Sequence, residues 1–106
     1  MSDLPTILIA DQDAHFRGEL EAILGQDYEI VLATDGTDAF EAATSIYPDL
    51  ILYEHRCPLI GLEQFIHAAA TVPRTNEIKL IALFDSKNDE KQFHSESSNR
   101  IIGRWV

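Results

Sequence analysis

The stretch Thr6-Ile-Leu-Ile-Ala10, followed directly by Asp11-Gln-Asp13, decides the fold. An apolar run this short and without polar alternation indicates a strand that is buried on both faces of a sheet. Acidic residues follow at the point where such a strand ends. Further along the chain, similar apolar runs alternate with segments whose apolar residues have helical spacing.

The pattern predicts five strands and four helices. Strands are expected over residues 6–10, 28–33, 49–53, 78–84 and 100–106. Helices are expected from residue 16 to 24, from residue 37 onward, over 62–69, and over a polar segment at about 86–99. The first helix takes Phe16, Leu20, Ile23 and Leu24 as its apolar face. Asp13 suits its N-cap and Gly25 its end.

Strand and helix patterns alternate along the whole chain, which predicts an α/β fold. The expected sheet is parallel, with helices on both faces and right-handed crossovers. Ligands of such sheets bind outside the carboxyl ends of the strands. The residues expected at that edge are Asp11, Gln12, Asp13, Glu54, His55, Arg56, Phe84, Asp85 and Arg104.

Composition narrows the classes of protein to consider. The 106 residues suffice for one domain, and 45% of them are apolar. A single cysteine, Cys57, cannot form an internal disulfide, so a cytoplasmic location is expected. No apolar run reaches the roughly 20 residues that cross a bilayer. The net charge of −10 would repel a phosphate backbone, so no direct nucleic-acid binding is expected.

Four segments of the chain resemble the receiver domains of two-component response regulators. They are Ile7-Leu-Ile-Ala-Asp-Gln-Asp-Ala-His-Phe-Arg17, Ala33-Thr-Asp-Gly-Thr-Asp-Ala-Phe40, Pro48-Asp-Leu-Ile-Leu-Tyr-Glu-His-Arg-Cys-Pro58 and Ile81-Ala-Leu-Phe84. The resemblance implies one receiver-like domain over residues 1–106. It implies a flavodoxin-like, doubly wound sheet of five strands in the order 2-1-3-4-5. The family's final helix is absent from the sequence, so the chain is expected to be the N-terminal part of a longer protein or to be covered by a partner.

The resemblance places Glu54 at the phospho-acceptor position, where the family has aspartate. The extra methylene moves the carboxylate by about 1.5 Å, a C–C bond length. Misplacement by about 1 Å can cost on the order of 10²-fold in rate. Two interpretations of Glu54 stay open. It either mimics the charge of a phosphorylated aspartate, or it is a solvated loop acid left after the chemistry was lost.

The other family positions are altered as well. Asp11 matches the first acidic position, but Gln12 replaces a metal-ligating carboxylate, and an amide is a poorer ligand for Mg²⁺. Phe84 stands at the switch position, where the family has Thr or Ser, and Arg104 at the position of its lysine. Binding of Mg²⁺ is therefore expected to be weak at most. Any site would use Asp11, Glu54 and the main chain of Arg56, and no other cofactor is expected.

These departures favour an atypical receiver, a "pseudo-receiver", over an enzyme. It would signal through contacts with a histidine kinase or an output protein, without aspartate phosphorylation, and a homodimer is a further arrangement to consider. One alternative is a receiver that accepts a phosphoryl group on Glu54. Another alternative follows from Asp11-Gln-Asp13, which resembles haloacid-dehalogenase phosphatases, with Asp11 as nucleophile and Asp13 as acid/base.

Overall fold

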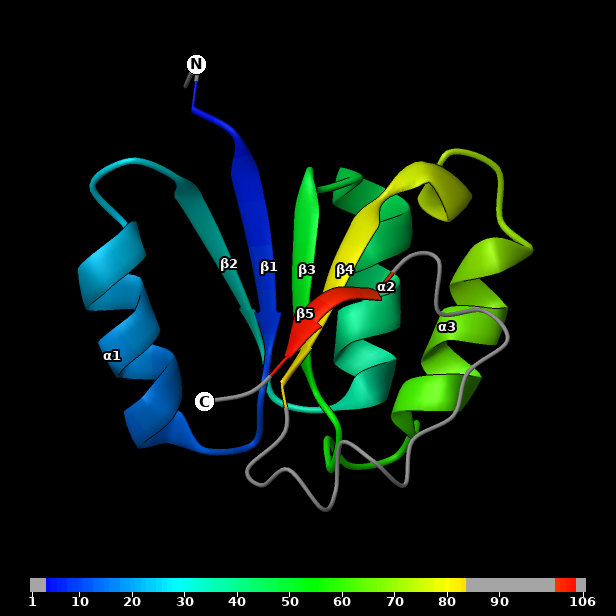
Figure 1. The fold of residues 1–106 in the computed structure, drawn as a ribbon, viewed down its shortest axis with the longest axis horizontal. Helices are drawn as coiled ribbons and strands as arrows, with labels where there is room; N and C mark the ends of the chain where they lie inside the picture. The colour runs from blue at the N-terminus through cyan, green and yellow to red at the C-terminus, as the bar shows by residue number, and fades with distance from the viewer. Residues whose placement is uncertain (1–3, 84–100, 105–106) are drawn as a thin grey trace.

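The computed structural model describes residues 4–83 and 101–104, the second range for its backbone only. Strands and helices alternate as predicted, with ends that differ by one or two residues. The helix predicted over 86–99 lies outside the described residues. In chain order (Figure 1), the elements are β1 (Thr6–Ala10), α1 (Ala14–Leu24), β2 (Glu29–Ala33), α2 (Gly36–Ile46), β3 (Leu50–Glu54), α3 (Leu62–Ala70), the 3₁₀ turn η1 (Thr75–Glu77), β4 (Lys79–Leu83) and β5 (Ile101–Arg104).

All five strands form one parallel sheet in the order β2-β1-β3-β4-β5, which confirms the predicted topology. The strands end together at one edge of the sheet, the lower edge in Figure 1. At this edge Ala10 of β1 lies beside Tyr53 of β3. Glu54, the last residue of β3, lies beside Leu83 of β4. The register therefore brings the end of β3 between the ends of β1 and β4.

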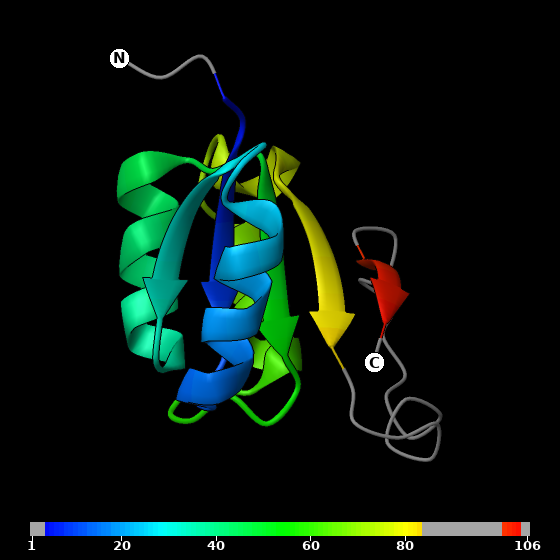
Figure 2. The same cartoon turned by 90° about the vertical axis from the view of Figure 1, so that its left-hand side faces the viewer.

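Helices cover both faces of the sheet, as the alternation predicted (Figure 2). On one face α2 and α3 enclose the main core. Its largest fully buried side chains include Tyr53 and Phe65, whose ring centroids lie 4.3 Å apart. This core continues through Leu8, Ala10, Ala33, Ala39, Ala43, Ile51, Ile66, Ala69, Leu80 and Ala82.

On the opposite face, α1 is the one helix among the described residues, and none of its own residues is buried. Leu20 and Leu24 pack against a smaller cluster whose buried members are Ile7, Ile9 and Leu52. Ile23 was predicted on the apolar face of this helix, but it is 70% exposed. Each residue turns a helix by about 100°, so Leu20 and Leu24 share a face that Ile23 does not.

Side-chain caps explain where the first two helices begin. The Asp13 carboxylate accepts hydrogen bonds from the main-chain N–H groups of His15 and Phe16, at 2.9 and 3.2 Å. The N-cap predicted for Asp13 is therefore present. Asp35 caps α2 through the N–H of Asp38 at 2.8 Å, so Asp35-Gly36 begins a helix and not a hairpin. No helix among the described residues is long and apolar enough to span a membrane.

Candidate functional site

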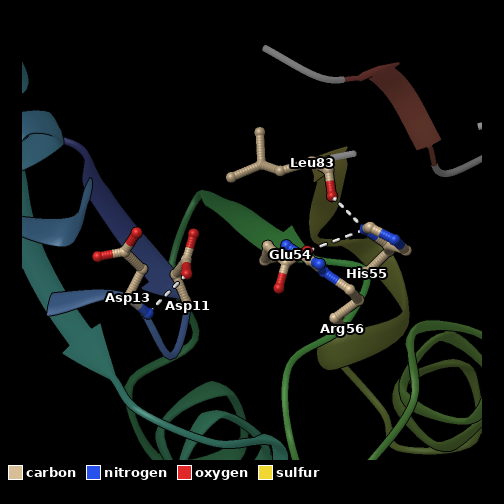
Figure 3. A network of polar contacts seen from close by, with 6 residues as sticks. All are labelled: Asp11, Asp13, Glu54, His55, Arg56 and Leu83. Carbon is tan, nitrogen blue, oxygen red and sulfur yellow. Dashed lines mark hydrogen bonds and ion pairs between the residues drawn. The ribbon is translucent and has the colours of Figure 1, made fainter. Parts of the chain in front are cut away.

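Two carboxylates, from Asp11 and Glu54, are buried at the carboxyl edge of the sheet (Figure 3). Asp11 directly follows β1 and is 3% exposed, while Glu54 ends β3 and is 8% exposed. Side chains alternate along a strand, so both follow the apolar residues of the α1 face, Ile9 and Leu52. Burial raises the pKa of Asp11, and the nearby charge of Glu54 raises it further. The edge predicted from the topology thus does concentrate acidic groups.

Asp11 is held mainly by groups of its own loop. One carboxylate oxygen, Oδ1, accepts a hydrogen bond of 2.9 Å from the main-chain N–H of Asp13. The Arg17 guanidinium donates to the main-chain carbonyl oxygen of Asp11 at 2.5 Å. Burial is the largest cause that raises the pKa of Asp11, and the charge of Glu54 adds to it. The Asp13 hydrogen bond and Arg17 act in the opposite direction on this pKa.

Glu54 is held by its two successors in the chain. Its Oε2 atom lies 2.9 Å from His55 Nδ1 and 3.5 Å from Arg56 Nε. The interpretation of Glu54 as a solvated loop acid is therefore wrong, because the residue belongs to β3 and is almost fully buried. The His55 side chain is 16% exposed and that of Arg56 is 59% exposed. Water screens the Arg56 contact more strongly, so the His55 contact carries more weight.

The loop after Glu54 is fixed by hydrogen bonds to the main core. The Cys57 N–H donates to the Glu54 carbonyl oxygen at 2.9 Å, and the Gly36 N–H donates to that of Pro58 at 2.7 Å. The Tyr53 hydroxyl donates to the Ile60 carbonyl oxygen at 2.5 Å. Burial raises the pKa of the Cys57 thiol to about 11, so this thiol is neutral at physiological pH. The backbone that carries Glu54 is therefore rigidly supported.

The residues present do not fit a Mg²⁺ site of the kind that the resemblance implies. Gln12 is exposed, and Asp13 uses its carboxylate to cap α1. Within the part of the chain that the structure describes, no group of three His, Cys, Asp or Glu side chains could hold a metal ion. The guanidinium of Arg17, which donates to the Asp11 carbonyl oxygen, also places a positive charge close to Asp11, which disfavours a dication there.

The sequence placed some of these residues correctly and missed others. Asp11 and Glu54 are both buried at the predicted edge, and Arg56 contacts Glu54 through its side chain, not through its main chain. Gln12 is exposed, and Asp13 caps α1. The side chains of Phe84 and Arg104 lie outside the described ones, so the roles predicted for them stay predictions. His55 and Arg17 were not expected as partners of the carboxylates. The turn after β3 breaks the alternation of strand side chains, which lets His55 reach Glu54, its own neighbour in the chain.

Comparison with known proteins identifies the fold. No family model matches the chain. The sensor histidine kinase TmoS of Ectopseudomonas mendocina is 29% identical over 85% of this chain, which spans 9% of that protein. Protein-glutamate methylesterase/protein-glutamine glutaminase 3 of Pseudomonas syringae pv. syringae (strain B728a) is 31% identical over 63% of this chain and 18% of its own length.

Among solved structures, the CheY-like response regulator receiver domain of Methylobacillus flagellatus superposes with a TM-score of 0.83 at 17% identity. The superposition covers 97% of this chain and 86% of the other. The chain has the fold of a response-regulator receiver domain. In this receiver fold, β1 and β3 end where the two buried carboxylates lie, so Asp11 and Glu54 occupy the edge that the topology makes available to ligands.

Proposed function

We propose that the chain is an atypical receiver domain that acts in two-component signalling without phosphorylation of an aspartate. Glu54 takes the acceptor position and supplies a permanent carboxylate there. The domain, residues 1–106, would be one part of a longer cytoplasmic signalling protein and would have no enzymatic activity of its own. Its partner would be a histidine kinase or an output protein, in keeping with the likeness to a segment of the sensor histidine kinase TmoS.

One observation carries this proposal: the Glu54 carboxylate already has partners within the protein. A nucleophilic carboxylate must approach a phosphoryl donor in line with the leaving oxygen. Here Oε2 is engaged by His55 Nδ1 at 2.9 Å, and the side chain is 10% exposed. Hydrogen bonding to a carboxylate stabilises its charge, so Glu54 is suited to be read as a fixed negative charge by a partner.

The surroundings of Glu54 also favour a role without metal. Phosphoryl transfer in this setting needs a dication to neutralise the oxygens of the transferred group. Gln12 offers a neutral amide in place of a carboxylate, and Arg17 lies beside Asp11. Asp13, the acid/base of the phosphatase alternative, accepts two main-chain hydrogen bonds as a helix cap, which leaves it poorly placed for proton transfer to a leaving group.

A titration with beryllofluoride and Mg²⁺ tests this proposal, with backbone amide NMR shifts as the readout. We expect no saturable shift change for Asp11, Glu54 and Leu83 up to millimolar concentrations. A double variant with Gln12→Asp and Glu54→Asp adds one carboxylate and gives the other the shorter side chain of the family pattern. It is expected to respond more strongly, because it gains a hard anionic ligand at position 12. A saturable response of the unmodified protein that disappears in Asp11→Ala would overturn the proposal.

A further inference from the structure

His55 stands between oxygen atoms of two neighbouring strands (Figure 3). Its ring nitrogen Nδ1 lies 2.9 Å from Oε2 of Glu54, at the end of β3. The same nitrogen lies 3.3 Å from the main-chain carbonyl oxygen of Leu83, at the end of β4. Carboxylate and carbonyl oxygens only accept hydrogen bonds, so Nδ1 must carry the hydrogen. The contacts therefore fix one ring nitrogen as the donor.

The Leu83 carbonyl oxygen is engaged twice by His55. It accepts the main-chain N–H of His55 at 2.9 Å in addition to the ring contact. This pair of contacts continues the β3–β4 pairing beyond its last register pair, Glu54 with Leu83. The end of β4 is thus held to the residue that directly follows Glu54, and the same side chain holds the Glu54 carboxylate.

Burial makes this arrangement sensitive to the charge of Glu54. The side chains of His55 and Glu54 are 16% and 10% exposed, so water screens their interaction weakly. A hydrogen bond to a charged acceptor is roughly twice as strong as one between neutral groups. A neutral group at position 54 would weaken its contact with Nδ1, so the ring would be held less firmly between the two strand ends.

We propose that His55 is a positioning residue that couples the charge at position 54 to the carboxyl end of β4. This inference rests on the proposed function, in which the Glu54 carboxylate is the group that a partner reads. Leu83 directly precedes Phe84, which has no hydroxyl to form a hydrogen bond with an anion at the site. His55 supplies one donor that contacts the ends of both β3 and β4. A partner that binds at the end of one strand would therefore change how the end of the other strand is held.

Amide hydrogen exchange at His55 and along β4 measures this coupling. In His55→Leu, which keeps a comparable size but has no donor, we expect exchange on the order of tenfold faster at the His55 position and at the end of β4. His55→Asn places an amide N–H at the position of Nδ1 and should retain exchange close to that of the unmodified protein. Glu54→Gln should show a smaller acceleration, since its amide oxygen still accepts a hydrogen bond.

The double variant with Glu54→Gln and His55→Leu tests whether the two residues affect amide exchange through each other or independently. If the residues act through each other, it should exchange no faster than His55→Leu alone. The matched control is His15→Leu, because His15 and Glu19 form an exposed His–Glu pair at 3.7 Å on α1. This control should leave β4 unchanged. Nitrogen-15 shifts of the imidazole in the unmodified protein should show Nδ1 protonated, whether or not the variants fold.

An imidazole protonated only on Nε2, additive effects in the double variant, or equal effects of His55→Asn and His55→Leu would overturn the inference. Failure of the proposed function has a different signature. A saturable beryllofluoride response would show that Glu54 does not act as a fixed charge. The amide exchange of the His55 variants would still be as expected in that case. Unchanged amide exchange in His55→Leu would show that His55 does not couple position 54 to β4. It would not contradict the proposal that Glu54 acts without phosphorylation.

Discussion

The two faces of the sheet are packed very differently. On one side of the sheet, α2 and α3 contribute seven buried residues: Gly36, Ala39 and Ala43 of α2, and Leu62, Phe65, Ile66 and Ala69 of α3. On the other side, α1 buries none, and the cluster beneath it has three buried members, all on the sheet. A groove of about 340 Å³ remains there, lined by Pro5, Ile7, Leu24, Tyr28, Asp49, Leu50, Leu52 and Ile81.

This difference bears on how the two carboxylates of the site are held. Asp11 and Glu54 extend the rows of side chains on the sparsely covered α1 face. The loop that follows Glu54 is instead anchored to the dense face, through Tyr53 and Gly36. The Glu54 carboxylate thus lies on the α1 side of the sheet, while the loop that follows it is hydrogen-bonded to the α2 and α3 side. Substitutions on one side of the sheet at a time should show how much each side contributes to the free energy of unfolding.

The largest expected effect comes from truncating the main core. Phe65 is fully buried and contacts the rings of Tyr53 and Phe40. Phe65→Ala should therefore lower the free energy of unfolding by about 3–5 kcal/mol. Leu20→Ala on α1 removes a partly buried side chain and should cost about 1–2 kcal/mol. Urea unfolding of both variants measures the difference. Equal costs would mean that α1 is packed as tightly as α3.

Two glycines provide a second comparison of the layers. A Cβ atom at position 36 would lie 2.4 Å from Ile60 Cβ and 2.6 Å from the Tyr53 hydroxyl oxygen. Gly36→Ala should thus destabilise the fold by about 1–3 kcal/mol, because the loop after β3 must move. A Cβ at Gly18 of α1 meets nothing within 4 Å. Gly18→Ala should stabilise by about 0.5–1 kcal/mol through helix propensity.

Thermal unfolding of the two glycine variants, each compared with the unmodified protein, gives the sign of each effect directly. The two substitutions should change the free energy of unfolding in opposite directions. A destabilising Gly18→Ala would show that the surface of α1 is more closely packed than its contacts indicate. A neutral Gly36→Ala would show that the loop after β3 can move without loss.

A smaller effect is expected at Asp11, as a dependence of stability on pH. Burial raises the folded-state pKa of Asp11 above its ordinary value of 3.8, so the native state binds more protons than the unfolded chain between the two pKa values. The contribution to stability is fully present below pH 3.8 and is lost as pH rises through the folded pKa. Asp11→Asn keeps an acceptor for the Asp13 N–H and cannot ionise.

The difference in unfolding free energy between Asp11→Asn and the unmodified protein isolates this group from the other carboxylates. Relative to the unmodified protein, the variant should gain stability as pH rises from about 4 to 7, because the cost of ionising a buried carboxylate is removed. Chemical unfolding at several pH values measures this difference. A variant that loses stability relative to the unmodified protein over that range would show that Asp11 is stabilised as an anion by the fold.

The sequence was sufficient for the fold because its signals are local and agree with each other. The apolar run at residues 6–10 and the cap at Asp13 each determine an element without help from distant residues. Ile23 has the helical spacing of an apolar face, but it lies at one side of that face and is exposed, whereas Leu20 and Leu24 pack against the sheet. The partners of Glu54 could not be predicted, since they depend on the turn at His55 and Arg56, where strand alternation no longer applies.

Phosphotransfer from acetyl phosphate, followed by intact mass measurement, tests the central claim most directly. The protein with Mg²⁺ and acetyl phosphate should keep its unmodified mass. The Glu54 carboxylate is held by His55, and the described residues offer no group of three side chains that could hold a metal ion. Glu54→Asp alone should also remain unmodified, since Gln12 and Phe84 are retained. A stable phosphoryl adduct mapped to Glu54 would contradict the account and would make the chain a working phospho-acceptor.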